Sequence, residues 1–323
     1  LRLEVLRQVV ARGYELVGRE REQVVDAVVE IDRGSEPGLV HRRQTRFRPR
    51  MKITLLGTGS PIPDAARAGA ATLVQSDGAT MLVDCGRGVV MRLTGAGVIP
   101  PMLNAVLLTH LHSDHITDLN DVITTHWVMC PGPTTLRIFG PPGTRAVVDA
   151  TLAALAHDVQ YRIAHHDDLN TPPQLDVTEV VPGDVFAVGT ATIRVAATDH
   201  RPVEPSVAFR VDDGGRSAVL GGDGIPCAGL DELCAGADVY VQTVLREDLV
   251  RLVPSARFQD ILDYHSTVED AAKTAARAGV RTLVLTHYIP ALQPGQEDDW
   301  RKLASEHFTG DIVLGDDLTR VDI

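Results

Sequence analysis

A short apolar run that ends in a cluster of metal-ligand residues constrains this chain most. Residues 105–108 read Ala-Val-Leu-Leu, which is typical of a strand buried on both faces. Residues 109–115 read Thr-His-Leu-His-Ser-Asp-His and hold three imidazoles and one carboxylate. These residues come just past the end of the predicted strand, which is where α/β sheets place their functional sites.

The donor types in this stretch are those that divalent metal ions bind. Neutral imidazole nitrogen and carboxylate oxygen suit zinc and similar ions. His110 and His112 lie two positions apart and can reach one ion from an extended or turning backbone, whereas Asp114 and His115 come from the next turn. The spacing therefore indicates two neighbouring metals. The alternative is a chance cluster in a polar loop, against which the density of ligand types argues.

The run from His110 to His115 resembles the HxHxDH signature of the metallo-β-lactamase-fold hydrolases. Three later residues match the remaining ligands of that family in order, and each follows an apolar, strand-like run: His200, Asp223 and His287. The resemblance implies an αββα sandwich, built from two similar halves, with the site along one edge of its sheets. It also implies two zinc ions per chain, with Mn²⁺ as the alternative metal.

The family's ligand sets carry over residue by residue. The first metal site would comprise His110, His112 and His200; the second would comprise Asp114, His115 and His287; Asp223 would bridge them. The resemblance further implies that the two ions share a water whose pKa falls toward neutrality, so that hydroxide attacks phosphorus in line. Asp114 resembles the residue usually assigned as the proton acceptor, which makes it a catalytic candidate as well as a ligand.

A second motif narrows the subfamily. Residues 265–267 read His-Ser-Thr and precede an Ala-rich run, 268–279, that ends in glycine and predicts a helix. Ser266 and Glu269 have the spacing of a capping box. The motif resembles the His-Ser-Thr of the ribonuclease Z-like phosphodiesterases, which implies that His265 is catalytic and acts at the scissile phosphate. If the motif only caps a surface helix, His265 is incidental.

Three hydroxyl-bearing residues are candidates for contact with the substrate. Ser60 ends the Gly-rich run 57–60, which resembles the first turn of those enzymes and could present N–H groups to a phosphate, although a tight turn needs the same glycines. Ser266 and Thr267 precede the predicted helix, where backbone N–H groups favour an anion. The resemblance extends from about residue 51 to the C-terminus.

Two departures from the ribonuclease Z pattern bear on the substrate. The relatives carry a His-Glu-Ala-Thr motif whose glutamate orients the His-Ser-Thr histidine. The corresponding run, residues 238–245, has no glutamate in register, which leaves Glu247 or Asp263 as the candidate substitutes. Only 22 positions separate His200 from Asp223, which leaves no room there for the flexible arm with which many relatives clamp transfer RNA.

Charge and composition define two regions. The first 50 residues hold 11 Arg, no Lys and 8 acidic residues, whereas the remaining 273 hold 20 basic and 35 acidic residues. We therefore predict an N-terminal extension over 1–50 that is disordered or not native, followed by the hydrolase domain over 51–323. Within the extension, residues 3–31 have partial helical periodicity and 42–50 form an Arg-rich linker; a basic arm that holds RNA is the alternative.

The acidic balance of the hydrolase domain argues against a broad phosphate-binding face. Residues 124–133 and 157–168 are the alternative places for an RNA-binding arm, and the histidines of the second segment are otherwise surface residues. No run approaches the roughly 20 apolar residues of a membrane span, and no secretory signal begins the chain. Four cysteines without CxxC pairing suit a cytoplasmic protein, and the relatives commonly form homodimers.

Three functions fit these observations. The preferred interpretation is a zinc-dependent endoribonuclease of ribonuclease Z type that cleaves precursor tRNA at its 3′ side. A small-ester hydrolase on the same scaffold, either arylsulfatase-like or a cyclic-nucleotide phosphodiesterase, is the alternative that the missing arm and the acidic surface favour. A protein that binds metal and RNA without cleavage is the third, indicated only by the altered run 238–245. β-Lactamase or glyoxalase chemistry would leave residues 265–267 unexplained.

Overall fold

The computed structural model describes residues 51–323. The predicted extension over residues 1–50, with its helix and its Arg-rich linker, lies outside the described residues. Among the residues described, no helix is long and apolar enough to cross a membrane.

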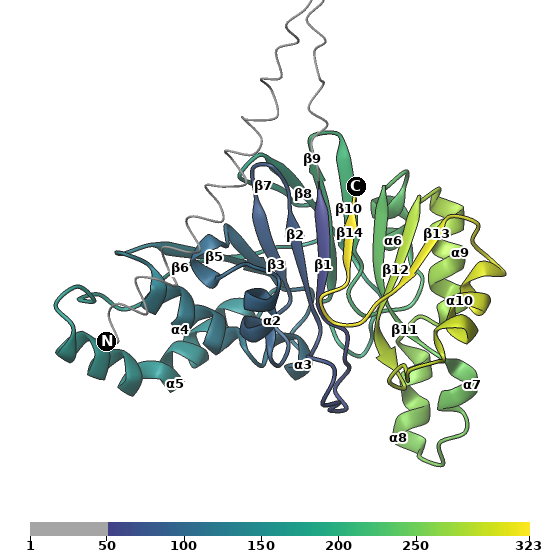
Figure 1. The fold of residues 1–323 in the computed structure, drawn as a ribbon, viewed down its shortest axis with the longest axis horizontal. Helices are drawn as coiled ribbons and strands as arrows, with labels where there is room; N and C mark the ends of the chain where they lie inside the picture. The colour runs from purple at the N-terminus through teal and green to yellow at the C-terminus, as the bar shows by residue number, and fades with distance from the viewer. Residues whose placement is uncertain (1–50) are drawn as a thin grey trace, which may run out of the picture. The chain divides into compact units, whose positions relative to one another are not determined.

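Two mixed sheets of seven strands each form the centre of the described chain (Figure 1). The first sheet has the strand order β14 (Arg320–Asp322), β1 (Lys52–Gly57), β2 (Ala71–Gln75), β3 (Thr80–Val83), β4 (Ala105–Leu107), β5 (Thr135–Gly140) and β6 (Gln174–Glu179). The second has the order β13 (Asp311–Leu314), β12 (Thr282–Ile289), β11 (Val239–Leu245), β10 (Arg216–Leu220), β9 (Val207–Asp213), β8 (Ala191–Ala197) and β7 (Val185–Val188).

Helices cover the outer face of each sheet. The first sheet carries α2 (Val89–Gly95), α4 (Leu119–Met129) and α5 (Thr144–His165), and the second carries α6 (Ala228–Cys234), α9 (Val268–Ala278) and α10 (Glu297–Ser305). The shorter helical elements are η1 (Pro100–Met102), α3 (Ser113–Ile116), α7 (Glu247–Val250), α8 (Ala256–Gln259) and η2 (Asp260–Asp263). This layering is the predicted αββα sandwich.

The strand β4 shows how the sequence pattern builds these layers. Val106 packs beneath the helices of the first sheet, whereas Leu107 packs between the two sheets, and both side chains are fully buried. Strand β4 pairs in parallel with β3 and β5, as expected of a strand apolar on both faces. Its carboxyl end therefore lies beside that of β3, and the ligand-rich residues 109–115 leave the sheet at this edge.

Helix α9 begins at Val268, as predicted, but its N-cap is not the predicted one. The predicted capping box of Ser266 and Glu269 is wrong by one residue. Thr267 is the N-cap: its hydroxyl accepts from the Asp270 N–H at 3.0 Å, and the Asp270 carboxylate accepts from the Thr267 N–H at 3.2 Å. The Ser266 hydroxyl instead donates to the Gly224 carbonyl at 2.7 Å. Both pairs have the same spacing, so only this tertiary contact distinguishes them.

Candidate metal centre

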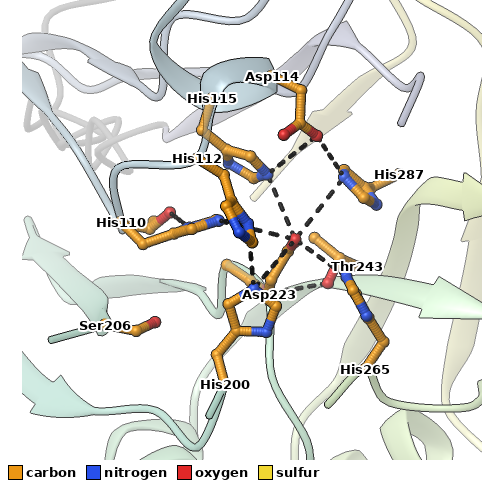
Figure 2. A network of polar contacts seen from close by, with 12 residues as sticks. His110, His112, Asp114, His115, His200, Ser206, Asp223, Thr243, His265 and His287 are labelled. Carbon is orange, nitrogen blue, oxygen red and sulfur yellow. Dashed lines mark hydrogen bonds and ion pairs between the residues drawn. The ribbon is translucent and has the colours of Figure 1, made fainter. Parts of the chain in front are cut away.

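The seven predicted ligands converge on one edge of the two sheets (Figure 2). Asp223, which follows β10, lies in the middle and is almost fully buried. Four imidazole nitrogens lie within 3.4–3.9 Å of its Oδ2 atom, those of His110, His115, His200 and His287. One carboxylate is thus placed between histidines contributed by both halves of the sandwich.

The donor atoms form two principal groups. His110, His112, His200 and Asp223 make the first, and Asp114, His115 and His287 make the second; within each group the donor atoms lie within 4.8 Å of one another. In the first, the His112 Nδ1 lies 3.1 Å from the His110 Nε2 and 3.4 Å from the His200 Nε2. This division matches the one that the sequence resemblance implies, with Asp223 positioned to bridge the groups.

Unpartnered buried atoms show that a cation fits here. Among the described residues, the His115 Nε2 and the Asp223 Oδ1 are buried and have no hydrogen-bond partner. Leaving such atoms unpaired costs about 1–3 kcal/mol each, and more when the group is charged. Both residues belong to the donor groups, where a divalent ion would satisfy such atoms.

Asp84 lies against the second donor group, although none of the sequence motifs above includes it. Its carboxylate accepts from the His115 Nδ1 at 2.8 Å and from the N–H and hydroxyl of Thr109 at 2.8 and 2.9 Å. The contact places a proton on Nδ1 and directs Nε2 to the centre, as outer carboxylates do in metal sites. Only the sheet topology could have indicated this role: Asp84 follows β3, which pairs in parallel with β4, so the residues after both strands lie at the same edge of the sheet.

Backbone strain marks the same place. Asp84 and His287 have φ angles of 62° and 54°, in the left-handed region that non-glycine residues rarely adopt. Among the described residues, only Leu318 shares this property. Such strain persists where the surrounding structure enforces it, and here it falls on one ligand and on the residue that orients another.

Burial and neighbouring charges set the protonation of the two groups differently. In the first, burial lowers the pKa of His110 well below its usual value and that of His200 to about 4. In the second, burial would lower the pKa of His115, but Asp223 and Asp84 raise it well above the usual value. Burial would raise the pKa of Asp223, yet His287 and His115 hold it well below its usual range. The Asp223 carboxylate is therefore ionised, which is the state in which a carboxylate can ligate a metal ion.

His265 lies beside these residues. Its Nε2 is 3.2 Å from the Asp223 Oδ2, and its Nδ1 is 3.3 Å from the Ile261 carbonyl oxygen. Only 7% of the residue is exposed. His265 therefore faces the centre that the seven predicted ligands surround, which is the position that a role at the reacting phosphate requires.

Comparison with known proteins identifies the family. The family model of the beta-lactamase superfamily domain matches residues 79–288. The ribonuclease Z of Mycobacterium avium is 59% identical over 275 residues, which are 84% of this chain and 98% of that protein. The ribonuclease Z of Mycolicibacterium paratuberculosis is 58% identical, and the match again covers 84% of this chain and 98% of that protein. The chain belongs to the ribonuclease Z family. It is accordingly a metal-dependent hydrolase, an endoribonuclease of the metallo-β-lactamase fold.

Solved structures show the same fold. The metallo-beta-lactamase fold protein YhfI from Bacillus subtilis superimposes with a TM-score of 0.65 at 26% identity, covering 85% of this chain and 99% of that one. Human tRNase Z, short form, superimposes with a TM-score of 0.61 at 23% identity, covering 84% and 98%. The second likeness shows the fold. The predicted αββα architecture is thereby confirmed.

This ribonuclease Z family member replaces the missing glutamate with a main-chain group. Neither predicted substitute, Glu247 or Asp263, makes a hydrogen bond to His265; the Ile261 carbonyl oxygen occupies that place. In β11, the Thr243 hydroxyl donates to the Gly222 carbonyl at 2.9 Å. A carbonyl from the helical segment before His265 thus orients the imidazole, and the sequence offered no signal for it.

The predicted substrate contacts of this ribonuclease Z family member stay predictions. Ser266 and Thr267 use their hydroxyls within the protein, on Gly224 and Asp270. Ser60 is 7% exposed and follows β1. Of the proposed arms, residues 124–133 begin within α4, and 157–168 end α5 with exposed histidines that belong to neither donor group.

Proposed function

We propose that this chain is a two-zinc endoribonuclease that cleaves precursor tRNA at its 3′ side, with Mn²⁺ as the alternative metal. The observation that carries the proposal is the convergence of two donor groups on Asp223, with His265 3.2 Å from the same carboxylate. Relatives that are 54–59% identical and bear the name ribonuclease Z support it. The small-ester alternative has no comparable support.

The metal ligands are proposed residue by residue. His110, His112 and His200 would hold one ion, Asp114, His115 and His287 the other, and Asp223 both. When bound, two such ions lower the pKa of a shared water and neutralise charge on the phosphate. Asp84 keeps His115 in the tautomer that ligation needs.

Two residues would handle protons. The Asp114 Oδ2 lies 3.1 Å from the His287 Nε2 and accepts the proton released by the attacking water. Burial would raise the pKa of Asp114, but the contact with His287 lowers it, so the carboxylate is ionised at neutral pH. The His265 Nε2 faces the centre and protonates the oxygen that leaves phosphorus. The departing RNA strand is thereby released as a neutral hydroxyl.

One assay separates the alternatives. Zinc-loaded protein is incubated with a precursor tRNA and, separately, with bis(p-nitrophenyl) phosphate, a cyclic nucleotide and an aryl sulfate. We expect one cut at the 3′ side of the acceptor stem. Turnover of small esters alone would contradict the tRNA assignment and favour the small-molecule hydrolase. Stoichiometric RNA binding without a cut would favour the non-cleaving alternative.

The proposal extends to location and assembly. All four cysteines lie among the described residues and are free, as suits a reducing cytoplasm. The family resemblance adds a homodimer. Light scattering on the zinc-loaded protein tests the assembly, and a mass equal to one chain would remove the dimer from the proposal.

A further inference from the structure

One short segment supplies main-chain acceptors to two imidazoles of the centre. The Tyr264 carbonyl oxygen lies 2.8 Å from the His200 Nδ1, and the Ile261 carbonyl oxygen lies 3.3 Å from the His265 Nδ1. Unlike a side-chain acceptor, a carbonyl cannot rotate independently of the chain. The direction of the His265 imidazole therefore depends on where the backbone at Ile261 is held.

This segment packs only through partly buried side chains. In Figure 1, α7 and α8 lie at one end of the second sheet, outside the layers of the sandwich. Neither α8 nor η2 contains a buried residue. Their side chains Phe258, Ile261 and Leu262 pack against a small apolar cluster, separate from the main cores, of Leu245, Val250 and Ile289. The position of the Ile261 carbonyl thus rests on this small cluster together with the hydrogen bonds of the segment.

Gln259 provides a specific tie within the segment. Its side-chain amide donates two hydrogen bonds, to the Val250 carbonyl at 2.7 Å and to the Val253 carbonyl at 2.9 Å. Both hydrogens of the amide are used, and both acceptors lie at the end of α7 or just beyond it. Gln259 therefore connects α8 to α7, two residues before Ile261.

No other protein group among the described residues takes over the Nδ1 atom of His265. The His265 imidazole has two hydrogen-bond partners: the Ile261 carbonyl at Nδ1 and the Asp223 carboxylate at Nε2. On β11, Gln242 and Thr243 both donate to the Gly222 carbonyl, at 3.1 and 2.9 Å, and so support the turn before Asp223 instead.

We propose that Gln259 is a positioning residue for the ribonuclease reaction: by tying α8 to α7 it fixes the Ile261 carbonyl and, through it, the imidazole of His265. This inference rests on the proposed function, because it matters only where His265 donates a proton to a leaving oxygen. The two hydrogen bonds of the Gln259 amide go to Val250 and Val253, which belong to neither donor group.

The test compares Gln259→Ala and Gln259→Leu with wild type on precursor tRNA. We expect kcat to fall about 10- to 100-fold, as for other outer partners of an active-site imidazole, while KM and the zinc content stay unchanged. Gln259→Leu keeps side-chain volume without the donors, so it tests the tie even if the alanine variant folds poorly. The matched control is Gln174→Ala. Gln174 is the first residue of β6, and its side-chain amide likewise donates to a main-chain carbonyl, that of Pro172.

A double-mutant cycle separates positioning from mere stability. In a His265→Ala background, Gln259→Leu should change kcat no further, because its effect passes through the missing imidazole. On bis(p-nitrophenyl) phosphate, whose p-nitrophenolate leaves without a proton, the single variant should keep the wild-type rate. Additive losses, an unchanged kcat on tRNA, or equal losses on both substrates would overturn the inference. A wild type that cuts no precursor tRNA refutes the proposed function and this inference together.

Discussion

At the scale of single residues, Asp223 is the group on which most others depend. Its Oδ2 faces four of the ligand imidazoles and also His265, and its ionised state is maintained by His287 and His115. The sequence could predict this residue because it follows a strand in a recognisable order. It could not predict Asp84, since nothing local distinguishes that aspartate from a turn residue; only the pairing of β3 with β4 brings it to His115.

Removing the bridging carboxylate should abolish the centre. We expect Asp223→Ala to lose bound zinc and all cleavage of precursor tRNA at every pH, because both donor groups lose a shared ligand. Metal analysis of the purified variant and a cleavage assay measure this. Asp322→Ala, at an exposed position of β14, is the control and should resemble wild type. Cleavage by Asp223→Ala would rule out the two-metal arrangement.

His265 should affect turnover without affecting metal. We expect His265→Ala to retain both zinc ions and to lower kcat on precursor tRNA about 100-fold or more, the usual contribution of a positioned proton donor. Single-turnover cleavage together with metal analysis gives both quantities. A wild-type rate would reduce His265 to a residue that merely precedes the helix cap.

Acid should empty the second donor group first. The pKa values of His115 and His287 are raised, so protons compete there at higher pH, whereas that of His200 is lowered to about 4 and that of His110 is lowered as well. As pH falls, the ion held by Asp114, His115 and His287 should therefore leave before the other. Zinc content after dialysis at a series of pH values should fall in two steps. Simultaneous loss of both ions would contradict this difference.

At the scale of elements, the sequence predicted strand β4 and the start of α9 but assigned the cap of α9 to the wrong residue. Strand β4 could be predicted because its apolar side chains pack on both faces of the sheet. The capping box was misplaced by one residue because Ser266 and Thr267 both have an acidic residue three positions later. The Gly224 carbonyl, which is distant in sequence, engages Ser266 and leaves Thr267 as the N-cap. The segment α7 to η2 carries no periodic signal, which is why its part in orienting His265 was not predicted.

The corrected cap has a measurable consequence. We expect Thr267→Ala to destabilise the protein by about 1 kcal/mol, because one N-terminal N–H of α9 loses its acceptor. Urea denaturation of zinc-loaded protein measures the change. Thr309→Ala, at an exposed threonine, should leave the free energy of unfolding unchanged. If Thr267→Ala had no effect, the capping box would not contribute to stability.

At the scale of the described chain, the centre joins the two halves of the sandwich. The first half supplies the ligands after β4, and the second supplies those after β8 and β10 and within β12. The family resemblance predicted this arrangement, since hydrophobic periodicity alone does not tell which sheets face each other. The return of β14 to pair with β1 in the first sheet had no sequence signal.

Metal removal should consequently lower global stability. A ligand that binds only the folded state adds about 2.7 kcal/mol when present at 100 times its Kd. We expect the melting temperature to fall on treatment with a chelator and to recover when zinc is added back. Asp223→Ala should show no such response. A wild-type melting temperature that ignores chelation would mean that the two halves are held together without the ions.

The order of the ligands along the chain has a consequence for biosynthesis. A ribosome releases His110, His112, His200 and Asp223 before it reaches His287. The first donor group is thus fully translated while the second still lacks a member, so on the growing chain only the first group can be complete. The donor group that we expect acid to empty first is the one that synthesis completes last.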